Sequence, residues 1–155
     1  MSIEKVTAYF ESLGIADRIR ILDESSATVA LAAEALHCDG ARIAKTLSFA
    51  NGDGAILVVA AGDARIDNAK FRAQFGIKAK MLTPEEAVAR VGHAVGGVCP
   101  FAVFEGTEVY LDVSLRRFET VFPACGSSNS AIELTCEELE AYAAPRAWVD
   151  VCKFA

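Results

Sequence analysis

The spacing of apolar residues changes several times along this chain, and each change predicts a different element. Apolar residues recur at helical intervals in 3–13 and in 28–36, which predicts two amphipathic helices. One further helical turn is expected over 40–44. Charged and apolar residues alternate in 18–21, which is typical of a short strand with one buried face.

Two strands joined by a tight turn are predicted next. Residues 46–50 alternate, whereas 55–61 are continuously apolar, as in a strand at the centre of a sheet. The turn sequence Asn51-Gly-Asp-Gly54 lies between them, and Asn and Gly readily adopt the positive φ angles of a hairpin turn. The sequence therefore predicts a β-hairpin.

Three more helices carry recognisable start or stop signals. The helix expected over 67–75 is closed by Gly76. The sequences Thr-Pro-Glu-Glu and Thr-Cys-Glu-Glu are capping boxes, which predict helices over 83–91 and 135–143. These signals fix where the helices begin better than where they end.

Short strands dominate the rest of the chain. They are expected at 98–104, 109–112, 121–122, 131–134 and 148–151. Because helices and strands do not alternate regularly, a doubly wound sheet is not expected. We predict a single α+β domain over residues 1–155, with a mixed, curved or barrel-like sheet flanked by helices.

Composition excludes several classes of protein. Of the 155 residues, 53% are hydrophobic, which excludes intrinsic disorder. The longest apolar run, 55–61, is far shorter than the ~20 residues of a membrane span, and the first residues contain no signal-peptide core. A cytoplasmic protein without a membrane partner is expected. The net charge of −6 argues against binding to duplex DNA, so any contact with nucleic acid must be local or shared with a partner.

The cysteines and sequence motifs exclude other kinds of site. The five cysteines include no Cys-x-x-Cys pair, so we expect reduced thiols and neither a zinc site nor a disulfide framework. Serine-hydrolase, dinucleotide-binding, P-loop and His-Glu-x-x-His motifs are absent from the sequence. No metal and no cofactor is expected.

Two histidines are available for catalysis. His37 follows a predicted helix, where a C-cap is the more common role. His93 lies in a glycine-rich loop six residues before Cys99. A thiol–imidazole pair of Cys99 and His93 is therefore one candidate nucleophilic site.

Lys45 stands out among the charged residues because it lies in an apolar stretch between a helical turn and a strand. In one interpretation its stem follows the surface and its ammonium group is solvated. In the other, a partly desolvated ammonium group points into a cleft and holds an anionic or carbonyl oxygen. The residue alone does not decide between them.

A glycine pair provides a second candidate. In Val95-Gly-Gly-Val-Cys-Pro-Phe101, Gly96 and Gly97 let a ligand approach the backbone, and their amides could polarise a carbonyl. Pro100 stiffens the exit from this loop. The alternative is a glycine bulge at the start of a strand.

A third candidate is the small polar loop 124–130, with the sequence Ala-Cys-Gly-Ser-Ser-Asn-Ser. It is either an ordinary turn or a wall of hydroxyl and amide groups that lines a polar pocket.

Taken in order, these segments resemble the YbaK family, also called the prolyl-tRNA synthetase-associated editing domain. The resemblance covers about residues 25–140. It is carried by Ile43-Ala-Lys-Thr-Leu47, the strand 56–60, Asp67 with the following helix, Val95-Gly-Gly-Val-Cys-Pro-Phe101, Tyr110-Leu-Asp112, Gly126 and Ile132-Glu-Leu134.

The resemblance implies a free-standing trans-editing hydrolase that uses no metal. Such enzymes cleave the ester between a wrong amino acid and the 3′ end of a tRNA, typically tRNA(Pro). Lys45 matches the lysine on which activity in the family depends most, and Gly96 to Pro100 match the Gly-x-x-x-Pro element. The substrate-binding residues expected on this basis are Thr46, His93, Gly96, Gly97, Cys99, Pro100, Gly126, Ser127, Ser128 and Asn129.

One position departs from the branch of the family that is specific for cysteine. That branch has an acidic residue where this chain has Ala131. We therefore expect removal of alanine, 2-aminobutyrate or a similarly small amino acid ahead of cysteine. Transient association with prolyl-tRNA synthetase or an elongation factor is expected to supply affinity for tRNA.

Two alternatives remain at this stage. The first is a non-catalytic module that binds a nucleotide or an amino acid and acts as a regulator. The second is a thiol hydrolase that uses Cys99 and His93.

Overall fold

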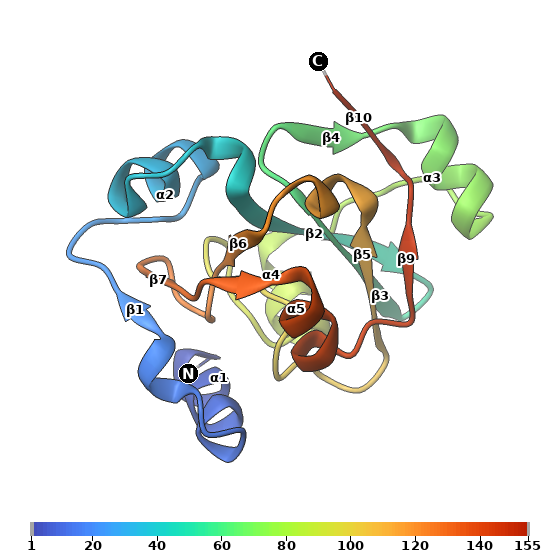
Figure 1. The fold of residues 1–155 in the computed structure, drawn as a ribbon. Helices are drawn as coiled ribbons and strands as arrows, with labels where there is room; N and C mark the ends of the chain where they lie inside the picture. The colour runs from blue at the N-terminus through green and yellow to red at the C-terminus, as the bar shows by residue number, and fades with distance from the viewer. Residues whose placement is uncertain (1, 155) are drawn as a thin grey trace.

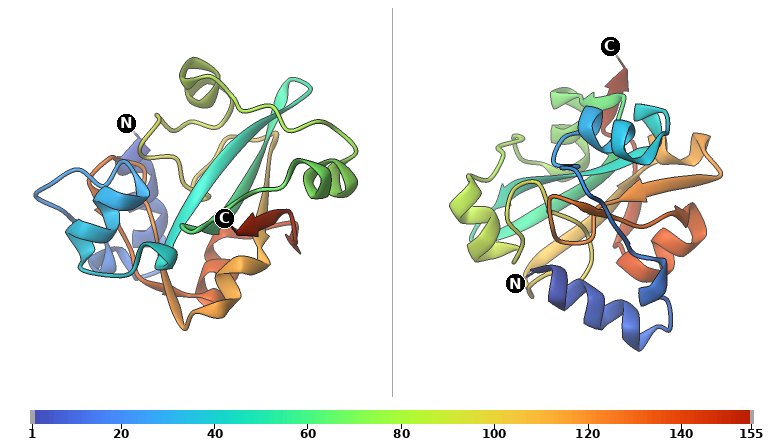
Figure 2. Two further views of the ribbon diagram at one scale, coloured as in Figure 1. Left: turned by 90° about the horizontal axis from the view of Figure 1, so that it is seen from above. Right: turned by 90° about the vertical axis from the view of Figure 1, so that its left-hand side faces the viewer.

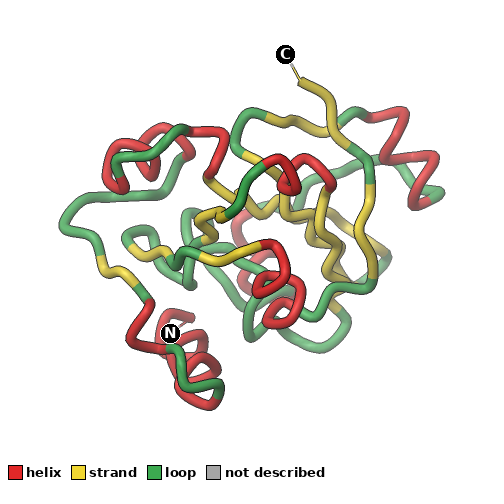
Figure 3. Tube along the Cα trace, viewed as in Figure 1, coloured by secondary structure: helices red, strands yellow, loops and turns green. Residues whose placement is uncertain are grey.

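A computed structural model describes residues 2–154, and a curled six-stranded sheet lies at its centre (Figures 1 and 3). The strands of the sheet are β2 (Ile43–Asn51), β3 (Gly54–Ala61), β5 (Thr107–Asp112), β6 (Thr120–Pro123), β8 (Leu134–Thr135) and β9 (Ala147–Val149). Their order is β8-β6-β2-β3-β5-β9. Parallel and antiparallel neighbours are mixed, since β3 pairs antiparallel with β2 and parallel with β5.

Helices and two small strand pairs surround this sheet. The α-helices of the described residues are α1 (Ser2–Ser12), α2 (Val29–Leu36), α3 (Asn68–Phe75), α4 (Pro84–Arg90) and α5 (Cys136–Ala143). Strand β1 (Arg20–Ile21) pairs with β7 (Ser130–Ala131), and β4 (Ala64–Ile66) pairs with β10 (Cys152–Phe154). Figure 2 shows the β2–β3 hairpin crossing the molecule between α2 and α3. The predicted single α+β domain with a mixed, curved sheet is confirmed.

The capping signals act as the sequence predicts. The Thr83 and Thr135 side chains each accept a hydrogen bond from the backbone N–H of a glutamate three residues later, and the carboxylate of that glutamate accepts one from the backbone N–H of the threonine. The Asp67 side chain caps α3 by accepting a hydrogen bond from the backbone N–H of Lys70, and Gly76 ends the helix with a φ of 72°. His37 is confirmed as the C-cap of α2, with a φ of 54°.

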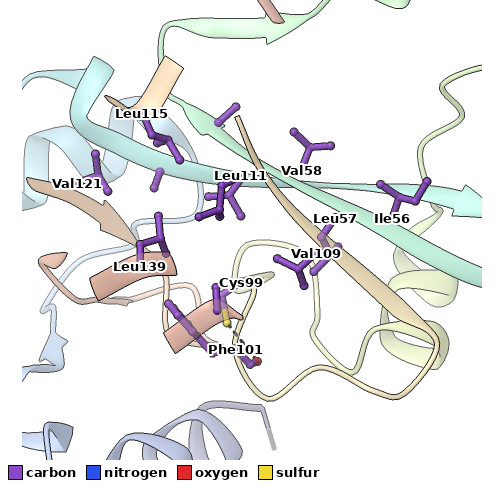
Figure 4. Close-up of a cluster of buried hydrophobic side chains, with 14 of the residues drawn as sticks. Ile56, Leu57, Val58, Cys99, Phe101, Val109, Leu111, Leu115, Val121 and Leu139 are labelled. Carbon is purple, nitrogen blue, oxygen red and sulfur yellow. Dashed lines mark hydrogen bonds between the residues drawn. The ribbon is translucent and has the colours of Figure 1, made fainter. Parts of the chain in front are cut away.

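The two faces of the sheet pack against different partners. On one face, α3 brings Phe71 against Phe49 of β2, with ring centroids 4.7 Å apart. On the other, Leu111 of β5 lies among Cys99, Phe101 and Leu139, which are fully or almost fully buried (Figure 4). Both faces are therefore covered, which explains the unbroken apolar run of β3.

The predicted strand 98–104 is wrong. This segment is an irregular loop in which Pro100 lacks a backbone N–H, and Ala102 has a φ of 52°, which interrupts an extended chain. Its apolar side chains Cys99 and Phe101 are buried under the sheet without forming part of it. Hydrophobicity was therefore a sign of burial here and not of strand structure.

Other boundaries also differ from the expectation. The strand expected over 18–21 is reduced to β1, because 16–18 form a 3-10 turn and Arg18 turns to bind Glu138. Residues 131–134 divide between β7 and β8, which pair with different strands. The short strands β4 and β10 were not predicted. They pair with each other although they lie far apart in the sequence, with Ile66 opposite Cys152.

Within residues 2–154, no helix has the length and apolar character that would be needed to cross a membrane.

Candidate active site

A pocket with a volume of about 270 Å³ lies beside the first half of β2. Helix α2 and the loops around residues 81, 96 and 130 form its other walls. The lining residues are Ser26, Ala27, Thr28, Val29, Ala32, Leu36, Ile43, Ala44, Lys45, Thr46, Leu47, Ser48, Met81, Leu82, Ala87, Val95, Gly96, Val98, Phe122, Ala124, Ser130 and Ala131. Lys45 is the one charged side chain among them.

The pocket lies against a stretch of β2 whose outer edge, the one facing away from β3, is not paired with another strand of the described residues. Strand β6 pairs with β2 only at Ile43 and Ala44. Farther along, Ala50 donates a hydrogen bond to Lys80 O at 2.8 Å, and Ser48 O accepts one from Leu82 at 3.0 Å.

Thr46 lies in the gap between these two sets of bonds. Alternate residues of a strand direct their N–H and C=O groups to the same edge. Ser48 and Ala50 direct theirs away from β3, so Thr46 presents its own to the pocket. The Thr46 hydroxyl oxygen is also buried and has no hydrogen-bond partner within residues 2–154. The pocket therefore offers unpaired main-chain and side-chain groups to a ligand.

Lys45 is half-buried, and its ammonium nitrogen lies 3.4 Å from Gly62 O. Burial lowers the pKa of Lys45, and the nearby Cys152 and Asp63 act in the opposite direction. Asp63 is itself held by Arg117, with a shortest N–O distance of 2.6 Å. The Lys45 ammonium group is thus partly desolvated and lies at a pocket, which agrees with the interpretation in which it points into a cleft.

The glycine loop divides between the pocket and the core. Gly96 lines the pocket and has a φ of 92°, which favours glycine. Gly97 does not line it, and its amide already donates to Ala94 O at 3.0 Å. A Cβ at Gly97 would lie 2.6 Å from the backbone of Gly126, so the two loops meet backbone to backbone. Pro100 is buried and does not line the pocket.

Cys99 and His93 do approach each other, with 3.5 Å between Sγ and Nε2. Both side chains are fully buried, and neither lines the pocket. Burial raises the pKa of the Cys99 thiol to about 12 and lowers the pKa of His93. His93 Nε2 also lies 2.7 Å from Phe101 O. The pair is therefore neutral and away from the pocket, which does not favour a thiolate nucleophile.

The polar loop 124–130 mostly bonds to itself and to its neighbours. Ser127 Oγ lies 2.8 Å from Ser130 Oγ and 2.9 Å from Asn129 Oδ1. Ser128 O accepts a 2.6 Å hydrogen bond from the Ser26 backbone. Gly126 accepts a bond from the Ser2 hydroxyl.

Gly126, Ser127, Ser128 and Asn129 do not line the pocket. The residues of this region that do line the pocket are Ala124, Ser130 and Ala131. Ser130 belongs to the polar loop that the sequence indicated as a possible pocket wall, whereas Ser26 and Met81 were not predicted. Their neighbours in sequence gave no signal, because their position depends on contacts with distant segments.

No group of three or more His, Cys, Asp or Glu residues in 2–154 could hold a metal ion.

Comparison with known proteins adds to this geometry. Residues 23–142 match the model of the aminoacyl-tRNA editing domain. The chain belongs to the aminoacyl-tRNA editing domain family. The matched range includes every residue that lines the pocket.

Individual relatives of this editing domain are similar over almost their whole length. The uncharacterized protein YwhH of Bacillus subtilis (strain 168) is 53% identical over 154 residues, which cover 99% of this chain and 98% of that protein. The crystal structure of a candidate trans-editing enzyme for prolyl-tRNA synthetase is 29% identical, with a TM-score of 0.87 over 98% of this chain and 97% of the other. A hypothetical protein of known structure is 27% identical, with a TM-score of 0.84, and the coverage is 96% and 99%. The family supports an editing role with mischarged tRNA as the substrate.

Proposed function

We propose that this protein is a trans-editing deacylase that hydrolyses tRNA(Pro) mischarged with a small amino acid, such as alanine or 2-aminobutyrate. The observation that carries the proposal is a single half-buried ammonium group, Lys45, in an otherwise uncharged pocket beside the open edge of β2. A pocket of this kind binds and polarises an ester, and it offers no carboxylate or imidazole as a general base.

In the proposed reaction, water attacks the carbonyl carbon of the ester that joins the amino acid to the terminal ribose. The bond from that carbon to the 3′ oxygen breaks, and the oxygen leaves with a proton as a ribose hydroxyl. Lys45 holds a phosphate or carbonyl oxygen of the substrate. The main-chain groups of Thr46 and Gly96 fix the carbonyl and the amino acid, and such oriented donors act where charge develops.

The side chains that line the pocket include no general base, so we infer that a group of the substrate takes part in proton transfer. The hydroxyls of Ser26, Ser48 and Ser130 line the pocket, but no histidine does so. An unassisted serine is a weak nucleophile at neutral pH. We infer that the neighbouring 2′ hydroxyl of the terminal ribose takes part in activating water, so that no Ser–His pair is required.

The small volume of the pocket supports a small amino acid as the substrate. Apolar side chains of Val29, Ala32 and Leu36 line its α2 wall. A synthetase distinguishes side chains that differ by one methylene by only ~1–3 kcal/mol, so a second pocket is needed to remove small amino acids from a proline enzyme. The net charge of −6 supports transient association with prolyl-tRNA synthetase or an elongation factor as an added source of affinity.

The test is deacylation of tRNA(Pro) charged separately with alanine, cysteine, serine, 2-aminobutyrate and proline. We expect rapid clearance of alanine or 2-aminobutyrate and little or no clearance of proline. Cys99→Ser should retain activity, which separates this mechanism from a thiol hydrolase. If no species is cleared, even with synthetase added, the proposal is wrong and the pocket would serve a binding module instead.

A further inference from the structure

The pocket is too small to enclose the whole end of a charged tRNA. Pockets that bury most of a drug-sized ligand have volumes of about 300–1,000 Å³. The volume here is about 270 Å³. An aminoacyl group and its ribose would occupy such a space, which leaves the terminal adenine at the mouth.

Apolar side chains are exposed at that mouth. Met81 and Val95 line the pocket from different loops, yet they remain 57% and 65% exposed. A flexible thioether makes favourable contacts with aromatic rings. Met81 is therefore a suitable surface for a base that lies outside the pocket.

The walls of the mouth differ in charge. The segment that includes α2, residues 22–36, contains three acidic residues and no Lys or Arg. The glycine loop 94–98 has no charged residue. Residues 77–82, with the sequence Ile-Lys-Ala-Lys-Met-Leu, contain two lysines and no acid. Of these three walls, residues 77–82 are suited to a polyanion.

The segment 77–82 is also held in a fixed position. Met81 forms a β-bridge with Phe49, and the flanking backbone groups of Lys80 and Leu82 bond to β2. Exposure alternates over 77–80, where Lys78 and Lys80 are exposed and the residue before each of them is partly covered. In an extended chain, residues two apart project to the same side. Lys78 and Lys80 therefore project to the same side of the segment, and Met81, the residue after Lys80, projects to the other side.

One acidic group lies close to this segment. Lys80 contributes to lowering the pKa of Glu86, but that carboxylate is chiefly held by Thr83 and also pairs with Arg90 at 3.0 Å. Lys80 therefore shares Glu86 with stronger partners.

We propose that residues 77–82 bind the single-stranded 3′ end of the tRNA, with Met81 against the terminal adenine and Lys78 and Lys80 against the preceding phosphates. The inference rests on the proposed function and adds the direction of the strand, which leaves the pocket across β2 and away from α2. Local attraction of this kind is compatible with the negative net charge of the chain.

The test uses two stable ligands. One is an oligonucleotide that ends in CCA with alanine joined to the last sugar by an amide, and the other is the same alanyl amide on adenosine alone. Binding of each is measured over a range of NaCl concentrations. Each phosphate contact on a single strand contributes about 0.7 to the slope of log K against log[salt]. The double variant Lys78→Gln, Lys80→Gln should therefore reduce the slope for the oligonucleotide by about 1.4 and leave binding of the nucleoside unchanged.

Met81 and a matched pair of arginines complete the test. Met81→Ala should weaken binding of both ligands several-fold, and Met81→Leu should restore much of it. The control is the double variant Arg116→Gln, Arg146→Gln, which removes the same charge near β9, at the far edge of the sheet. It should leave the slope unchanged.

The outcomes separate the two proposals. If the wild type deacylates mischarged tRNA but the lysine variant keeps the wild-type slope, the inference is wrong and the proposed function stands. If the wild type deacylates no species and binds neither ligand, the proposed function fails and the inference fails with it.

Discussion

At the scale of single residues, Thr46 combines burial with an unpaired hydroxyl group. A buried polar atom without a partner costs about 1–3 kcal/mol. Thr46→Val keeps the β-branched shape and removes that oxygen, so we expect the free energy of unfolding in urea to rise by about 1 kcal/mol. Thr120→Val is the control, because it removes a 2.6 Å hydrogen bond to Glu133 and should lower stability. A loss of stability in Thr46→Val would show that its hydroxyl is paired in solution.

His93 makes stability depend on pH. Its pKa is lowered, chiefly by burial, so the folded state binds fewer protons than the unfolded state as pH falls. The stabilising contribution is complete above the unfolded pKa of about 6.5 and is lost as pH falls toward the lower folded pKa. Carboxylates whose pKa is lowered, such as Glu138, make stability depend on pH only at more acidic pH, below the unfolded pKa of the carboxyl group.

The measurement is urea unfolding between pH 7.5 and 5. We expect the wild type to lose stability over this interval and His93→Gln to show a flatter dependence. Equal slopes for the two proteins would mean that His93 becomes charged in the folded state as readily as in the unfolded state.

At the scale of elements, local signals predicted the helices and the hairpin, because their causes are local. Thr83 and Thr135 fix helix starts through bonds three residues away, and Asn51 to Gly54 make their own turn. Hydrophobicity failed at Phe101, since a buried loop and a buried strand share the same composition. Short strands such as β10 depend on a distant partner, so no local pattern revealed them.

The contact between the glycine loop and the 124–130 loop is another such element-level feature. A Cβ at Gly97 would meet the backbone of Gly126, which cannot move aside as a flexible side chain would. Gly97→Ala should therefore cost about 1–3 kcal/mol and displace Gly96 from the pocket, with reduced deacylation. Gly40→Ala is the control, because its Cβ would meet only Val29 at an ordinary 3.6 Å. Differential scanning calorimetry and a deacylation assay of both variants provide the comparison.

At the scale of the whole molecule, the pocket joins segments that are far apart in sequence. Lys45 and Gly96 could be singled out from their neighbours, and both reach the pocket. Ser26 and Met81 could not, because only the packing of distant segments brings them there. The sequence also could not show that Cys99 lies outside the pocket, because the burial of Cys99 depends on its packing with distant segments (Figure 4).

The N-terminal helix is predicted to be part of the same cooperative unit, although the family match begins at residue 23. Phe10 of α1 is fully buried, and its ring lies 4.8 Å from that of Phe101. Phe10→Ala should lower the free energy of unfolding by about 3–5 kcal/mol in a single transition. Leu13→Ala, at a 41% exposed position, should change it by no more than about 0.5 kcal/mol. A separate early transition for α1 would contradict this expectation.

We propose that Lys45 is required for chemistry and not for folding. The most direct measurement compares wild type, Lys45→Ala and Lys153→Ala in deacylation of alanyl-tRNA(Pro), with the melting temperature of each protein. Lys153 is an exposed lysine on β10 and serves as the matched control. We expect Lys45→Ala to lose at least about 100-fold in rate, as removal of one electrostatic group at a reacting carbonyl commonly does, while its melting temperature stays close to that of the wild type. An active Lys45→Ala, or one that loses activity only because it unfolds, would contradict it.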